Sequence, residues 1–146
     1  MFRYFRSRIA GASKQGGVRL LAILCSEADR SLWKVAARQR PNWQPLAAGS
    51  WDEAAPTLAN ERFAVIVCDR DLPGRDWRQT LQYLAKLSPC ILLASTGIDG
   101  ALWQEVVQCG GHDVLAKPLE EQRVLKTIDQ ALRYTATTTH ATATKR

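Results

Sequence analysis

Long apolar runs are missing from this sequence of 146 residues. No stretch approaches the roughly 18 consecutive apolar residues that a membrane-spanning helix needs. The first residues, Met1 to Arg8, are basic but hold no apolar core of the kind found in a secretory signal. We therefore expect no integral membrane segment and a cytoplasmic location.

Common signatures of catalysis are also missing. Neither usual type of glycine-rich phosphate-binding loop is present. The two histidines, His112 and His140, belong to no Ser/His/Asp set. The cysteines show no CxxC spacing and lie in or beside apolar segments, so we expect reduced, mostly buried thiols. They are Cys25, Cys68, Cys90 and Cys109. With these signatures missing, we expect a protein that is not an enzyme.

Composition and charge indicate one folded body with basic ends. A hydrophobic content of 46% is near the globular average, and the length is that of a single domain. Much of the net charge of +6 comes from residues 1–19, which hold five basic and no acidic side chains, and from Lys145 and Arg146. The other 13 basic residues face all 14 acidic ones. The body is nearly neutral, so we expect no nucleic-acid partner.

The chain divides into three parts. Residues 1–17 form a basic extension that we predict to be disordered; contact with an acidic partner or a membrane surface is its alternative role. Residues 18–134 form the folded domain. Residues 135–146 are rich in threonine and alanine, and we predict a disordered tail.

Within residues 18–134, apolar runs alternate with amphipathic segments. Runs rich in β-branched residues predict buried strands. The predicted strands are residues 18–24, 43–47, 63–68, 89–94 and 112–116. The predicted helices are residues 28–38, 51–60, 76–87, 100–109 and 120–134. Such alternation predicts parallel strands joined by right-handed crossovers.

Asp69 marks the centre of the chain. It follows a buried strand that begins at Phe63, and Pro73-Gly74 then makes a turn. In open α/β sheets this edge is where ligands bind. A carboxylate there can act as a nucleophile or a metal ligand. A loop carboxylate without chemistry is the alternative.

Two motifs make this body resemble the receiver domain of two-component response regulators. They are Asp69-Arg-Asp-Leu-Pro73-Gly74 and Gly110-Gly-His-Asp-Val-Leu-Ala-Lys117-Pro118. The predicted order of strands and helices agrees. The resemblance implies a flavodoxin-like α/β fold: a doubly wound, five-stranded parallel sheet in the order 2-1-3-4-5, with helices on both faces.

The resemblance also implies roles for individual residues. Asp69 matches the phosphoacceptor, whose carboxylate attacks a phosphohistidine to form an acyl phosphate. Lys117 matches the lysine that pairs with this carboxylate and then with a phosphoryl oxygen, and the Lys117-Pro118 bond is expected to be cis. Asp69 and the backbone carbonyl of Asp71 match ligands of Mg²⁺.

The Mg²⁺ site departs from the family pattern. The family has two acidic residues directly after the first strand, and the matching positions hold Cys25 and Ser26. Mg²⁺ prefers hard oxygen ligands, and a thiol is a poor substitute. Glu27 is the nearest acid and a weak candidate ligand. Mg²⁺ binding and its loss therefore both stay open.

Two switch positions depart as well. The hydroxyl residue that ends the fourth strand matches Ala94, and the neighbouring Ser95 is expected to point the other way. The aromatic switch residue of the fifth strand matches Val114. Since a valine cannot move a polar ring between buried and exposed positions, we expect a weakened switch.

These observations leave two main functions open. The first is a stand-alone receiver domain in a phosphorelay, which takes a phosphoryl group on Asp69 from a sensor histidine kinase or phosphotransfer protein. It would signal to an effector through residues 100–109, 112–116 and 120–134, where a dimer could also form. The second is a degenerate receiver that binds a partner without phosphorylation, with Asp69 and Lys117 as a structural ion pair. A flavodoxin-like fold with another ligand is a third alternative.

Overall fold

The structure is a computed structural model that describes residues 16–145, with side chains up to residue 135. The predicted basic extension therefore lies outside the described residues as far as residue 15. Five parallel strands form one sheet in the order β2-β1-β3-β4-β5, as predicted. The strands are β1 (Val18–Ile23), β2 (Trp43–Ala48), β3 (Val65–Asp69), β4 (Ile91–Ser95) and β5 (Asp113–Ala116).

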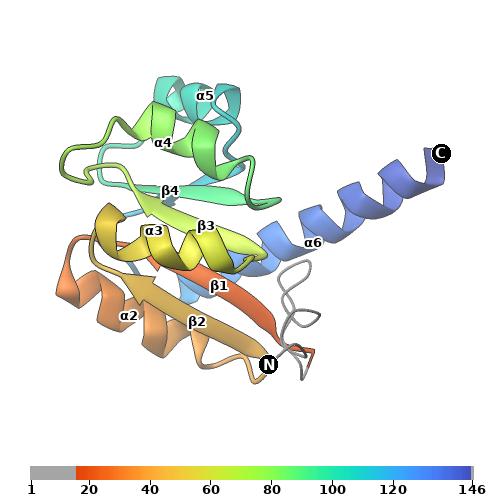
Figure 1. Cartoon of the computed structure of the whole chain (residues 1–146), viewed down its shortest axis with the longest axis horizontal. Helices are drawn as coiled ribbons and strands as arrows, with labels where there is room; N and C mark the ends of the chain where they lie inside the picture. The colour runs from red at the N-terminus through yellow and green to blue at the C-terminus, as the bar shows by residue number, and fades with distance from the viewer. Residues whose placement is uncertain (1–15, 146) are drawn as a thin grey trace.

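Helices cover both faces of the sheet (Figure 1). They are α2 (Glu27–Ala37), α3 (Trp51–Asn60), α4 (Trp77–Leu84), α5 (Gly100–Gln108) and α6 (Glu121–Lys145). Helices α2 and α6 pack on one face, and α3, α4 and α5 pack on the other. Within the described part of the chain, no helix has the length and apolarity to cross a membrane.

Buried strands supply both layers of the core. In β1, Leu20 and Ala22 belong to the layer under α2 and α6, while Leu21 and Ile23 belong to the layer under the other helices. This follows from the alternation of side chains along a strand. Strands β3 and β4 are buried along their whole length, so the middle of the sheet is a rigid base for the loops at its carboxyl edge.

Helix α2 turns Trp33, Ala36 and Ala37 to the core. Trp33 is fully buried, whereas Val35 is 51% exposed. The Trp33 indole donates a hydrogen bond from Nε1 to the carbonyl of Leu46 over 3.0 Å. A large ring with a polar partner on β2 therefore fixes the rotation of the helix.

Caps hold the helix that follows β2. The Ser50 hydroxyl accepts a hydrogen bond from the Glu53 amide over 3.1 Å, as in a capping box. The Glu53 carboxylate accepts from the Gly49 amide over 2.7 Å, one residue earlier than in the usual box.

Helix α6 is longer than the sequence predicted. Its end was expected at Tyr134, before a disordered tail, but helical backbone continues to Lys145. The Thr/Ala-rich segment contains neither glycine nor proline, and alanine has the highest helix propensity. At the start of this segment the Thr135 hydroxyl donates to the carbonyl of Ala131 over 3.0 Å. Figure 1 shows the end of α6 projecting away from the sheet.

Gly110 follows α5 with a φ of 97°, in a left-handed cap that favours glycine. An added Cβ would lie 2.9 Å from the Cβ of Ala85. We expect Gly110→Ala to lower the free energy of unfolding by about 1–3 kcal/mol, because backbone strain and a steric clash coincide. Urea unfolding measures this. Gly97→Ala is the control, since no atom lies within 4 Å of an added Cβ there. An equal loss in both variants would contradict the prediction.

Candidate functional site

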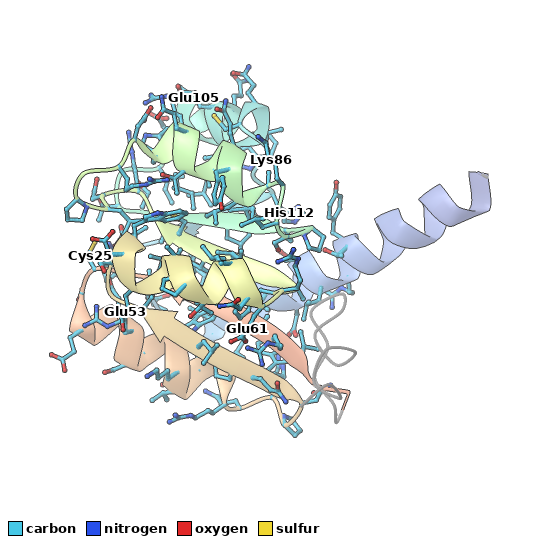
Figure 2. The ribbon with its side chains drawn as sticks, in the orientation of Figure 1. Cys25, Glu53, Glu61, Lys86, Glu105 and His112 are labelled. Atoms are coloured by element: carbon cyan, nitrogen blue, oxygen red, sulfur yellow. The ribbon has the colours of Figure 1, made fainter. Side chains whose placement is uncertain are left out.

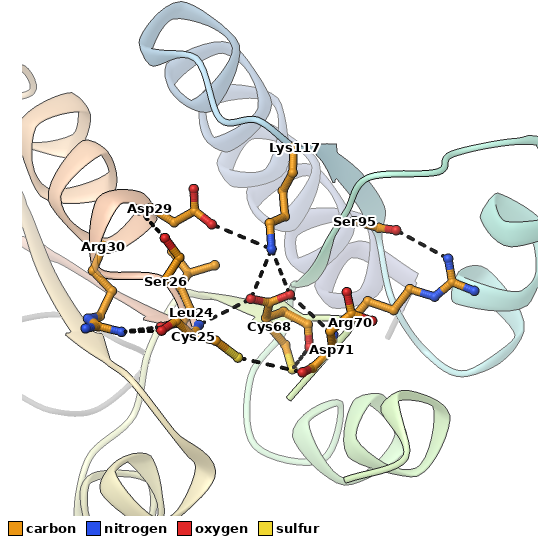
Figure 3. A network of polar contacts seen from close by, with 11 residues as sticks. Leu24, Cys25, Ser26, Asp29, Arg30, Cys68, Arg70, Asp71, Ser95 and Lys117 are labelled. Carbon is orange, nitrogen blue, oxygen red and sulfur yellow. Dashed lines mark hydrogen bonds and ion pairs between the residues drawn. The ribbon is translucent and has the colours of Figure 1, made fainter. Parts of the chain in front are cut away.

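Asp69 is the last residue of β3, between β1 and β4, and only 1% of its surface is exposed. Lys117 follows β5 and reaches over the edge of the sheet. Its Nζ lies 3.1 Å from Oδ1 and 3.2 Å from Oδ2 of Asp69 (Figure 3). The structure thus brings together the two residues that the motifs singled out. The Lys117-Pro118 bond is cis, as expected.

Two backbone amides complete the surroundings of this carboxylate. The Cys25 amide donates to Oδ2 of Asp69 over 3.2 Å, and the Asp71 amide donates to Oδ1 over 3.3 Å. A buried carboxylate needs such partners, since an unpaired buried charge is costly. Three loops at the carboxyl edge therefore converge on one side chain.

Asp29 belongs to the site, although sequence reasoning did not single it out. Its Oδ2 lies 3.6 Å from the Nζ of Lys117 (Figure 3). Burial lowers the pKa of Lys117, but the hydrogen bond and charge of Asp69, together with Asp29, outweigh it and raise the pKa above its ordinary value. The sequence feature that could have indicated Asp29 is Ser26, which caps α2. Its hydroxyl accepts a hydrogen bond from the Asp29 amide over 3.3 Å.

The residues present do not fit a Mg²⁺ site. The Cys25 thiol donates to the carbonyl of Asp71 over 3.7 Å, so the expected ligand carbonyl already has a partner. Burial and the nearby charge of Asp69 raise the pKa of Cys25, which keeps the thiol protonated. Glu27, the weak candidate ligand, is exposed. In residues 16–135, no group of three or more His, Cys, Asp or Glu side chains could hold a metal ion.

The four cysteines agree in part with the prediction of reduced, mostly buried thiols. All four are free. Cys68 and Cys90 are buried, and burial raises the pKa of each to about 12. Cys25 is exposed instead, at the carboxyl edge of the sheet and far from His112 at the opposite edge (Figure 2).

The two switch positions, Ala94 and Val114, carry apolar side chains on β4 and β5. Ala94 pairs in register with Asp69 and is fully buried, so a methyl group stands where a hydroxyl was expected. The Ser95 hydroxyl is buried and accepts a hydrogen bond from Nη1 of Arg70 over 3.4 Å. Val114 packs against the core layer under α3, α4 and α5. Arg70 was not singled out from the sequence, because its contact depends on two strand ends lying side by side.

Comparison with known sequences gives one informative relative. No family model matches the chain. The response regulator protein FleR of Pseudomonas aeruginosa is 31% identical over 84 residues. These residues make up 55% of this chain but only 17% of the length of FleR. The match therefore concerns a small part of that relative.

Comparison with solved structures identifies the fold. The chemotaxis response regulator CheY4 of Vibrio cholerae matches with a TM-score of 0.72 at 22% identity, over 80% of this chain and 99% of that one. A CheY-like receiver domain protein of Methanospirillum hungatei matches with a TM-score of 0.73 at 18% identity, over 83% and 98%. At these identities the likeness establishes the architecture alone.

The groups at the carboxyl edge of the sheet lead to a prediction about Mg²⁺ binding. We expect millimolar Mg²⁺ to leave the unfolding temperature of the wild-type chain unchanged, because a ligand of the folded state would raise it. The double variant Cys25→Asp, Ser26→Asp places two carboxylates after β1 and should gain a Mg²⁺-dependent rise. Thermal unfolding at constant ionic strength, with and without Mg²⁺, checks both. A rise in the wild-type chain would contradict the prediction.

Proposed function

We propose that residues 18–134, which have the fold of response regulator receiver domains, accept a phosphoryl group on Asp69 in a two-component phosphorelay. The observation that carries this proposal is the Lys117 ammonium within 3.2 Å of both Asp69 oxygens, at the edge of the sheet where ligands of such folds bind. We propose a signalling role through protein contacts and not an enzyme activity.

The proposed reaction is transfer from a phosphohistidine of a sensor kinase or phosphotransfer protein. An oxygen of Asp69 attacks phosphorus, the P–O bond forms, and the P–N bond breaks. The bonding electrons pass to the imidazole nitrogen, which then takes a proton. The product is an acyl phosphate on Asp69. Lys117 can move from the carboxylate to a phosphoryl oxygen, because its flexible stem carries a compact charge.

The proposed partner surface is formed by α5, β5 and α6. On α5, Trp103 is 47% exposed and Val107 is 44% exposed, one helical turn apart. A hollow of about 610 Å³ lies at β5 and α6, lined by Ile98, Val114 and Lys126 among others. Exposed aromatic and aliphatic side chains are features of protein interfaces, and tryptophan is common at their energetic centres. An effector or a second copy of the chain could use this surface.

We expect a small phosphodonor such as acetyl phosphate to add the mass of one phosphoryl group to the wild-type chain. Asp69→Asn should abolish the gain, because an amide cannot form the acyl phosphate. Intact mass before and after hydroxylamine, which cleaves acyl phosphates, measures this. Asp52→Asn makes the same change at an exposed position on α3 and should label normally.

The same labelling experiment can contradict phosphorylation of Asp69. A wild-type chain that does not label, with or without Mg²⁺, would contradict the proposal. A partner that binds the wild-type chain and Asp69→Asn equally well would then indicate a receiver fold that works as an interaction module. Labelling that persists in Asp69→Asn would place the acceptor elsewhere.

A further inference from the structure

Lys117 lies between two carboxylates. Besides Asp69, its Nζ contacts Oδ2 of Asp29 at 3.6 Å, and the side chains of Lys117 and Asp29 are each only 16% exposed. Ion pairs at this depth are screened less by water than pairs on the surface. The ammonium is therefore held from two sides, by the end of β3 and by the first turn of α2.

The position of Asp29 is fixed by the loop between β1 and α2. Arg30 donates from Nη1 to the carbonyl of Leu24 over 2.7 Å and to that of Cys25 over 3.0 Å, which clamps the loop. Gly49 leaves room for this clamp, since an added Cβ would lie 2.8 Å from the same Nη1. Ser26 caps the helix and bonds the Asp29 amide. The carboxylate is thus placed by backbone that is itself held.

We propose that Asp29 is a positioning residue, which holds the Lys117 ammonium beside the Asp69 oxygens so that the protein itself supplies the positive charge of the site. This inference rests on the proposed function, and it names Asp29 as the residue that keeps Lys117 in place for the proposed transfer. Asp29 takes a place that neither Cys25 nor Ser26 can take, because a thiol and a hydroxyl carry no negative charge to attract an ammonium.

The role has a consequence for phosphoryl transfer. Lys117 must leave the Asp69 oxygens when one of them bonds phosphorus, and it must stay close enough to meet a phosphoryl oxygen. A second carboxylate, 3.6 Å away, keeps the ammonium near throughout this exchange. The loss of Asp29 should therefore slow the transfer step more than it weakens the encounter with the donor.

Labelling kinetics test this consequence. With acetyl phosphate as the donor, we expect Asp29→Asn to lower the maximal labelling rate about tenfold, the size of effect typical of a lost orienting contact. The donor concentration for half-maximal rate should change less than about twofold. Asp29→Glu keeps the charge and should regain most of the rate, and Asp52→Asn should match the wild-type chain. An unchanged maximal rate in Asp29→Asn would overturn the inference, as would a rate that Asp29→Glu fails to restore.

A second measurement needs no phosphorylation. Nitrogen-15 NMR detects a lysine ammonium whose protons exchange slowly because carboxylates hold them. We expect such a signal from Lys117, assigned by its loss in Lys117→Gln, in the wild-type chain and in Asp52→Asn. It should broaden beyond detection in Asp29→Asn, whose fold is checked by its unfolding temperature. A signal that stays sharp in Asp29→Asn overturns the inference even if the chain labels. A chain that does not label, but shows the expected broadening, loses the proposed function and keeps the positioning contact.

Discussion

The ion pair between Asp69 and Lys117 is the interaction on which the carboxyl edge of the sheet depends. A carboxylate with 1% exposure is stable only if its charge and lone pairs find partners. The ammonium of Lys117 and the amides of Cys25 and Asp71 meet that need. These partners come from the segments after β5, β1 and β3. The charge of one side chain therefore ties together three loops that are far apart in the sequence.

The charge balance of the site explains how neutral residues after β1 are compatible with a lysine beside Asp69. In the family pattern, two further carboxylates beside the acceptor create a negative cluster that a divalent cation neutralises. Here Cys25 and Ser26 are neutral, and the Cys25 thiol bonds the carbonyl of Asp71. Two carboxylates, Asp69 and Asp29, share one ammonium. The neutral residues after β1 and the lysine beside Asp69 are thus parts of one electrostatic arrangement.

The buried runs predicted parallel strands, and the resemblance to receiver domains implied the sheet order and the pairing of Asp69 with Lys117, both of which the structure has. Neither predicted Asp29. Glu27 was chosen for its nearness to β1, but residues two apart on a helix do not face the same way. The helix turns Glu27 to solvent and Asp29 to the lysine. Distance along the sequence does not tell which residue of the first helical turn faces the site. That depends on the rotation of α2, which tertiary contacts such as the hydrogen bond of Trp33 fix.

Hydrogen bonds that do not involve Ala94 join the segments around Asp69 and Lys117 to the end of β4. The Ser95 carbonyl accepts a hydrogen bond from the Lys117 amide over 3.0 Å, and its hydroxyl accepts from Arg70, the residue after Asp69. The backbone of Lys117 and the side chain of Arg70 are thus both bonded to Ser95, the last residue of β4, and the chain runs from Ser95 into the loop before α5. Neither bond involves Ala94 or Val114, so both exist without a hydroxyl at the first position and without an aromatic ring at the second.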